Sequence, residues 1–163
     1  MIVVADATPL IALAKISHFT LLQQLFTSII ISQAVYEEVV VNARQRPGAS
    51  EIRAATWVHI QAPKDAAKVR YLQVELDPGE AETLVLAEEW KADWVLLDES
   101  KARRVAIILD LPHIGTIGLL LLAKRQGHIA EIRPLLDDLR SRQFHLSDRV
   151  YNAVLHQAGE SQQ

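Results

Sequence analysis

The hydrophobic residues of the chain fall into short runs separated by longer segments with helical spacing. Five runs are too short for stable helices and are predicted to be strands, at residues 2–5, 28–31, 57–60, 94–97 and, more weakly, 113–114. Helical spacing occupies residues 9–26, 33–43, 50–56, 79–90 and 99–109. This alternation predicts an α/β fold whose parallel sheet is covered by helices on both faces.

Three further helices are predicted after residue 115, over residues 116–124, 132–142 and 147–157. We therefore expect a single domain over residues 1–158, in which residues 128–158 form a C-terminal helical extension. Residues 159–163 are expected to be a disordered tail. A length of 163 residues, half of them hydrophobic, is enough for one well-filled core.

The composition excludes several classes of protein. The chain has no cysteine, so it has neither a disulfide framework nor a thiolate metal site. Its net charge of −3 does not suit a general nucleic-acid coat, so contact with a polyanion would need a local basic patch. No apolar run reaches the roughly 20 residues of a membrane span, and no export signal is visible. We expect a cytoplasmic protein that does not enter a membrane.

Two carboxylates occupy the same position relative to two predicted strands. Asp6 follows the run at residues 2–5, and Asp98 follows the run at residues 94–97. Polar ligands meet parallel sheets at the carboxyl ends of the strands, so this repetition indicates a site. The alternative is that each aspartate only caps the helix that follows it.

Two more acids lie near predicted helix starts. Glu80 lies in the first turn of the helix at residues 79–90, and Glu38 lies early in the helix after the second strand. Because successive helix residues are about 100° apart, Glu80 and Glu82 point to nearly opposite sides, and we select Glu80. Glu37 remains an alternative to Glu38. Stabilisation of the helix dipole is the structural explanation for all such first-turn acids.

A cluster of these four carboxylates would require protons or a cation. Two carboxylates about 5 Å apart repel by about 3 kcal/mol at an effective dielectric near 20. Since the chain lacks cysteine and a suitably spaced histidine pair, the expected cation is one that prefers oxygen ligands, Mg²⁺ or Mn²⁺.

Five motifs in order resemble those of the PIN domain ribonucleases, and within them the group related to VapC-like toxins. They lie at residues 4–11, 31–39, 77–82, 96–104 and 115–118, and the resemblance covers residues 2–125. It implies a three-layer α/β/α sandwich with a central, mostly parallel sheet of four or five strands, followed here by extra C-terminal helices. It also implies that the catalytic and metal-binding residues are Asp6, Glu38, Glu80 and Asp98, with Glu80 standing where many members carry the shorter Asp.

The same resemblance implies an endoribonuclease that uses Mg²⁺ or Mn²⁺ and serves as the toxin of a toxin–antitoxin pair. Its partners would be an RNA substrate, a small antitoxin protein and a second copy of the chain. The apolar runs at residues 10–16 and 117–123 are candidate partner surfaces, with burial in the core as the alternative.

Hydroxyl and basic side chains near the acids complete the predicted site. Thr8 and Thr116 could hydrogen-bond a metal-ligating carboxylate or a substrate phosphate, or could simply be caps. RNA contacts are predicted for three residues of the helix after Asp98, namely Lys101, Arg103 and Arg104. The alternative for these cations is a solvated helix face with an ion pair between Glu99 and Arg103.

Two other functions remain open from the sequence. A Mg²⁺-dependent phosphatase also places aspartate at strand ends, although a haloacid-type enzyme has a second aspartate at the position of Thr8. The other is a non-enzymatic interaction domain with the same fold, in which the acids only cap helices.

Overall fold

The computed structural model describes residues 1–43 and 45–161. All five predicted strands are present, with boundaries shifted by at most one residue. They form a single parallel sheet in the order β3-β2-β1-β4-β5. The strands are β1 (Val3–Ala5), β2 (Ile29–Ser32), β3 (Val58–Gln61), β4 (Trp94–Leu96) and β5 (His113–Ile114).

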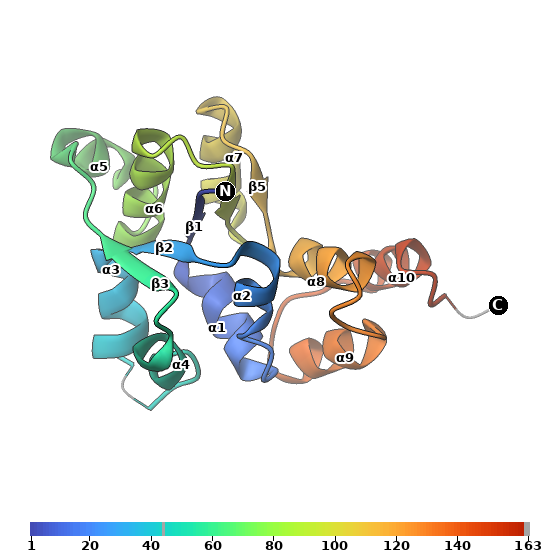
Figure 1. Ribbon diagram of the computed structural model, residues 1–163. Helices are drawn as coiled ribbons and strands as arrows, with labels where there is room; N and C mark the ends of the chain where they lie inside the picture. The colour runs from blue at the N-terminus through green and yellow to red at the C-terminus, as the bar shows by residue number, and fades with distance from the viewer. Residues whose placement is uncertain (44, 162–163) are drawn as a thin grey trace.

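Alternating residues of the central strand β1 pack into two separate cores. Val3 and Ala5 belong to one cluster, whereas Val4 belongs to the other. The first cluster includes residues of α1 (Ala7–Lys15), α2 (Leu21–Phe26) and α8 (Thr116–Arg125), and the second includes α5 (Ala66–Leu72), α6 (Pro78–Glu89) and α7 (Ser100–Ile108). Figure 1 shows α1 and α2 on one side of the sheet and α5, α6 and α7 on the other. The predicted α/β/α sandwich is confirmed.

The predicted helix over residues 9–26 is wrong at its middle, where the chain leaves α1 and re-enters a helix at α2. Ser17 has a left-handed backbone with φ of 59°, and the N–H of His18 donates to the carbonyl of Leu13. This turn buries Ile16 and Phe19, which the sequence pattern had placed inside a continuous helix. The apolar spacing persists across the turn, so the pattern alone did not reveal the break.

The predicted helix over residues 33–43 is also divided. It consists of α3 (Gln33–Tyr36) and a π-helical turn, η1 (Glu37–Val41), which is followed by α4 (Ala49–Ala54). The short helix α5 was not predicted, because Val69 is its one buried residue. Its start is marked by Asp65, whose side chain accepts a hydrogen bond from the N–H of Lys68.

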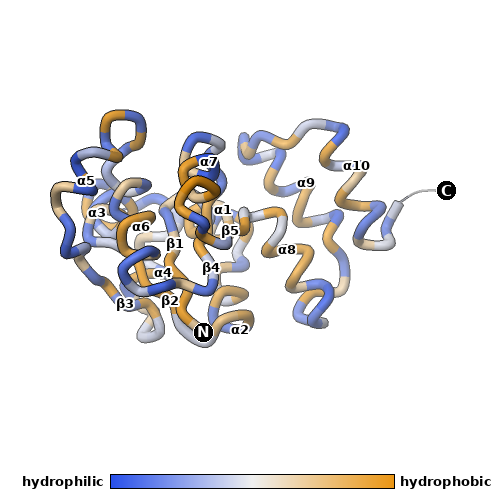
Figure 2. The backbone as a smooth tube through the Cα atoms, turned by 90° about the horizontal axis from the view of Figure 1, so that it is seen from above, coloured by the Kyte–Doolittle hydropathy of each residue, from blue (hydrophilic) through white to orange (hydrophobic). Residues whose placement is uncertain are grey.

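The C-terminal helices α9 (Arg133–Ser141) and α10 (Asp148–Gln157) pack against the same core as α1 and α8. Seen from above, they extend to the side of the sheet opposite α5 (Figure 2). The expectation of a free tail from residue 159 is wrong at Glu160. Its carboxylate pairs with Lys124 and accepts hydrogen bonds from the backbone N–H groups of Ile132 and Arg133. Residues 162–163 of the predicted tail lie outside the described residues.

The apolar runs proposed as partner surfaces lie mainly in the core. Leu10, Leu13, Leu119 and Leu120 are completely buried, so these runs do not offer a continuous docking face. Burial, the alternative use, accounts for them. Among the helices of the described residues, none has the length and apolar character needed to cross a membrane.

Candidate active site

Asp6 is a buried carboxylate at the end of the central strand. It occupies the N-cap position of α1 with an extended backbone, but its side chain accepts no capping hydrogen bond. Its own N–H donates to the carbonyl of Leu96, which fixes it beside the end of β4. Only 3% of the residue is exposed. Capping therefore does not account for this aspartate.

Glu38 and Asp6 border the same small space beside the start of α6. A Cβ placed on Gly79 would lie 3.1 Å from Oε2 of Glu38 and 3.5 Å from Oδ1 of Asp6. The two carboxylates thus come from η1 and from the end of β1 and meet against the backbone of α6. The absence of a side chain at Gly79 leaves room between the helix and the acids.

Glu80 takes part in a capping box at the start of α6. Its Oε2 accepts a hydrogen bond of 3.0 Å from the N–H of Asp77, and Oδ1 of Asp77 accepts one of 2.8 Å from the N–H of Glu80. Glu80 therefore also has a structural role at the start of α6, beside the predicted role as a metal ligand. Glu82 points elsewhere and accepts a hydrogen bond from the N–H of Ala34 at the start of α3.

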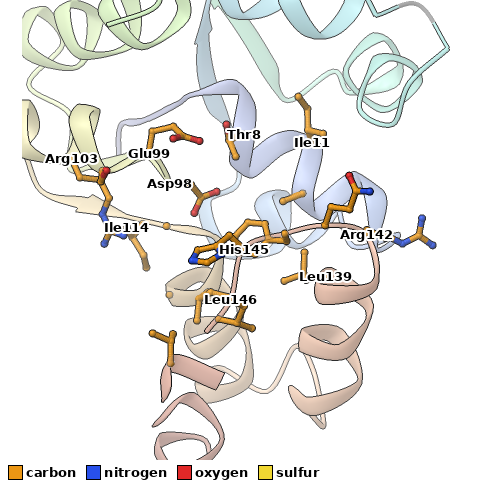
Figure 3. A pocket seen from close by; sticks show the side chains of 18 of the residues that line it. Thr8, Ile11, Asp98, Glu99, Arg103, Ile114, Leu139, Arg142, His145 and Leu146 are labelled. Atoms are coloured by element: carbon orange, nitrogen blue, oxygen red, sulfur yellow. The ribbon is translucent and has the colours of Figure 1, made fainter. Parts of the chain in front are cut away.

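Asp98 is held by Thr116 at the start of α8. Its Oδ1 accepts a hydrogen bond of 2.8 Å from the N–H of Thr116, and its Oδ2 accepts one of 2.6 Å from the hydroxyl. The aspartate thus caps α8, while Glu99 occupies the N-cap position of α7. A Cβ on Gly115 would lie 2.8 Å from Oδ1 of Asp98, so only glycine permits this approach. Thr8 and Asp98 line the same groove (Figure 3).

The mutual effects of the acids on their pKa values link Asp6, Glu38, Asp77 and Glu80 into one group, to which Asp98 does not belong. Burial raises the pKa of Asp6 from 3.8 to about 8; the nearby N–H of Ala7 opposes this, and Asp77, Glu80 and Glu38 add to it. Burial and the charges of Asp77 and Glu80 also raise the pKa of Glu38. These four residues, Asp6, Glu38, Asp77 and Glu80, are called the acidic cluster below.

The pKa values of the other two predicted acids are raised as well. For Glu80, burial raises the pKa, the N–H of Asp77 lowers it, and the charge of Asp77 raises it. For Asp98, burial raises the pKa, whereas both hydrogen bonds from Thr116 and the charge of Arg103 lower it. The charged form of Asp98 is therefore stabilised by Thr116 and Arg103, and none of the residues of the acidic cluster is a main cause of its pKa shift.

In residues 1–43 and 45–161, no group of three or more His, Asp or Glu side chains is arranged to hold a metal ion. Glu80 and Asp98 each accept a hydrogen bond from a backbone N–H group, that of Asp77 and that of Thr116. The sequence analysis did not select Asp77 as a site residue, although its charge acts on Asp6 and Glu38. The segment Asp77-Pro78-Gly79-Glu80 carries the signature of a capping box, which marks Asp77 as a helix cap.

A model of the PIN domain family matches residues 2–160. The chain belongs to the PIN domain family. No curated protein sequence matches it. The match extends past residue 125, where the sequence resemblance ended, and so includes α9 and α10. PIN domains are generally nucleases, so the match favours that hypothesis over a phosphatase.

The donor set of this PIN domain suits a divalent cation. All candidate ligands are carboxylate oxygens, as Mg²⁺ and Mn²⁺ prefer. Asp6 is buried without a hydrogen-bonded cap, and the charges of Asp77, Glu80 and Glu38 all raise its pKa. Gly79 keeps a space beside Asp6 and Glu38, and a Cβ placed there would make a tight contact of 3.1 Å with Oε2 of Glu38.

The three predicted RNA-contact residues lie exposed on α7 but differ in position. Arg103 lines the groove beside Asp98, and its charge lowers the pKa of that aspartate. Lys101 is close enough to Glu80 to lower its pKa. Arg104 is exposed and is not among the residues of the groove. The alternative ion pair between Glu99 and Arg103 is not among the salt bridges of the described residues.

Proposed function

We propose that this PIN domain is a metal-dependent endoribonuclease that hydrolyses RNA phosphodiester bonds. The observation that carries the proposal is the position of Asp6, buried beside Glu38 in a cluster of acids and without a capping hydrogen bond. Burying a negative charge without a partner is costly. Such an arrangement supports a cation-binding role rather than a structural one.

In this proposal Asp6, Glu38, Glu80 and Asp98 hold Mg²⁺ or Mn²⁺. A divalent ion would supply Lewis-acid chemistry, lowering the pKa of water and neutralising charge on the phosphate. The side chains of the protein then position the reactants. Thr116 orients Asp98 through two hydrogen bonds, as an outer partner commonly does for a ligating carboxylate.

The cations of α7 are proposed to bind the substrate. Lys101 and Arg103 are exposed and adjoin the acids, so they can contact phosphates next to the scissile bond. Arg104 is proposed as an outer contact. Thr8 lines the groove next to Asp98 and can donate a hydrogen bond to a phosphate oxygen or to a ligating carboxylate.

A second candidate function is a PIN domain that binds a partner but has no nuclease activity. One observation favours it: Oε2 of Glu80 accepts a hydrogen bond from the N–H of Asp77, and both oxygens of Asp98 accept hydrogen bonds from Thr116. The two functions differ in their response to metal. The nuclease cleaves single-stranded RNA with Mn²⁺ and stops in EDTA, whereas the interaction domain cleaves under neither condition.

The biological role is proposed to be that of a toxin that pairs with a small antitoxin and forms a homodimer. Support comes from the resemblance of residues 2–125 to VapC-like toxins. We expect the chain and the product of the neighbouring gene to elute together in gel filtration, earlier than either alone. Separate elution at micromolar concentrations would contradict the pairing.

A further inference from the structure

A groove of about 880 Å³ lies between the carboxyl ends of β4 and β5 with α1 on one side and the segment that joins α9 to α10 on the other. Thr8, Asp98 and Arg103 line it on the core side, and residues 142–147 line it on the other (Figure 3). Pockets that hold drug-sized ligands measure about 300–1,000 Å³. The groove therefore has room for a short stretch of an extended polymer.

Charge is distributed unevenly along this groove. Asp98 and Glu99 lie toward one end, whereas Arg142 lies at the end opposite Arg103 in Figure 3. Lys15, another lining residue, ends α1, roughly 10 Å along the helix from Thr8 at its start. The groove thus leads from the acids of the candidate active site to two cations, Lys15 and Arg142. Nε of Arg142 donates a hydrogen bond of 2.8 Å to Oδ1 of Asp138, so its Nη groups are the donors left for a phosphate.

The outer wall of the groove is preformed. Arg140 donates hydrogen bonds of 3.1 Å from Nε and 3.0 Å from Nη2 to the carbonyl of Leu146. The N–H of Phe144 donates to the carbonyl of Leu139, and Phe144 and Leu146 pack against the core. A ligand would not have to order this segment, which reduces the entropic cost of binding.

We propose that this groove binds the RNA chain on one side of the scissile phosphate, with Lys15 and Arg142 contacting backbone phosphates. The inference rests on the proposed nuclease function, because the acids at the other end mark where the reacting phosphate lies. His145 faces the groove between the two ends and can donate a further hydrogen bond to a phosphate. Apolar lining residues that are partly exposed, such as Ile11 and Ile117, offer contacts for the bases. The C-terminal extension is then part of the substrate site.

The test compares two double variants, each of which replaces one lysine and one arginine by glutamine, at different places on the protein. Lys15→Gln/Arg142→Gln alters the groove. Lys64→Gln/Arg70→Gln alters exposed cations on the α5 side of the sheet, outside the groove. Binding of a labelled, short single-stranded RNA is measured by fluorescence anisotropy in EDTA over a range of salt concentrations, and folding is checked by thermal melting.

Each phosphate contact adds about 0.7 to the slope of log affinity against log salt for a single strand. The groove variant should therefore bind more weakly, with a slope reduced by about 1.4, while the control variant keeps the slope of the parent. Equal slopes for the parent and the folded groove variant overturn the inference. So does a groove variant that binds RNA normally but no longer pairs with the antitoxin, since the groove would then serve a protein partner.

These outcomes are separable from failure of the proposed function. If the parent cleaves RNA with Mn²⁺ and the groove variant binds RNA as the control does, the groove assignment alone fails. If the parent neither binds nor cleaves RNA, the proposed function fails and the groove assignment fails with it.

Discussion

Replacing Asp6 by Asn should reduce Mn²⁺-dependent cleavage of single-stranded RNA by at least about 100-fold, a loss comparable with that from disturbing a metal ligand shell. The substitution preserves the shape of the side chain but removes the charge that would hold the cation. Because Asp6 makes no capping hydrogen bond, the substitution removes no helix cap, and we expect the variant to fold. Asp98→Asn should have a similar effect on cleavage. Initial rates at saturating Mn²⁺, with thermal melting as a check on folding, measure both.

Two further variants sharpen this comparison. Asp110→Asn makes the same chemical change at an exposed position and should leave cleavage unchanged. Glu80→Gln keeps an acceptor for the N–H of Asp77 but removes the charge, so a loss of activity separates metal binding from capping. If Asp6→Asn and Asp98→Asn cleave RNA as fast as Asp110→Asn, the assigned residues are not the catalytic site.

The second large effect concerns stability and pH in the absence of metal. Since burial raises the pKa of Asp6 from 3.8 to about 8, the folded protein holds this proton more tightly than the unfolded chain does. The resulting stabilisation is complete below pH 3.8 and is lost as the pH rises through 8. Glu38, Glu80 and Asp98, whose pKa values are also raised, contribute with the same sign.

In EDTA, the melting temperature of the parent should therefore fall between pH 5 and pH 8.5, and Asp6→Asn should remove much of that fall. Between pH 5 and the pKa of about 8, the upper limit for Asp6 is about 4 kcal/mol, at 1.36 kcal/mol per pH unit. Even half of this corresponds to roughly 5 °C for a chain of this size. Melting curves at matched ionic strength measure the difference, with Asp110→Asn as the control. Parallel pH profiles for the parent and Asp6→Asn would show that Asp6 is not a buried, unpaired acid.

The sequence pattern predicted the sheet well because its strands are buried by both layers. Val3, Val4 and Ala5 are all buried, and a run that is apolar on both faces is hard to mistake for a surface element. The turn at Ser17 was not predicted because the hydrophobic spacing continues across it. What marks the turn is the left-handed backbone of Ser17, which the sequence pattern does not show. Helix α5 was not predicted because it has one buried residue, Val69, and its sequence therefore shows no helical spacing of apolar residues.

The sequence indicates that Asp6 and Asp98 both follow strands, but it does not give the order of the strands. The pairing of β1 with β4, which brings the two aspartates to neighbouring strand ends, comes from the structure. The partner of Asp98 is 18 positions away at Thr116, so its hydrogen bonds depend on how α8 meets the sheet. Glu80 is both a candidate metal ligand and a member of the capping box with Asp77, so the capping signature alone does not decide between the two roles.

The central claim is that buried carboxylates of the acidic cluster bind a divalent cation, and a crystal soaked in Mn²⁺ tests it most directly. We expect anomalous density for Mn²⁺ in contact with Asp6 and Glu38, beside Gly79. A soak at neutral pH that gives no anomalous density there, with both side chains ordered as they are without metal, would contradict the claim.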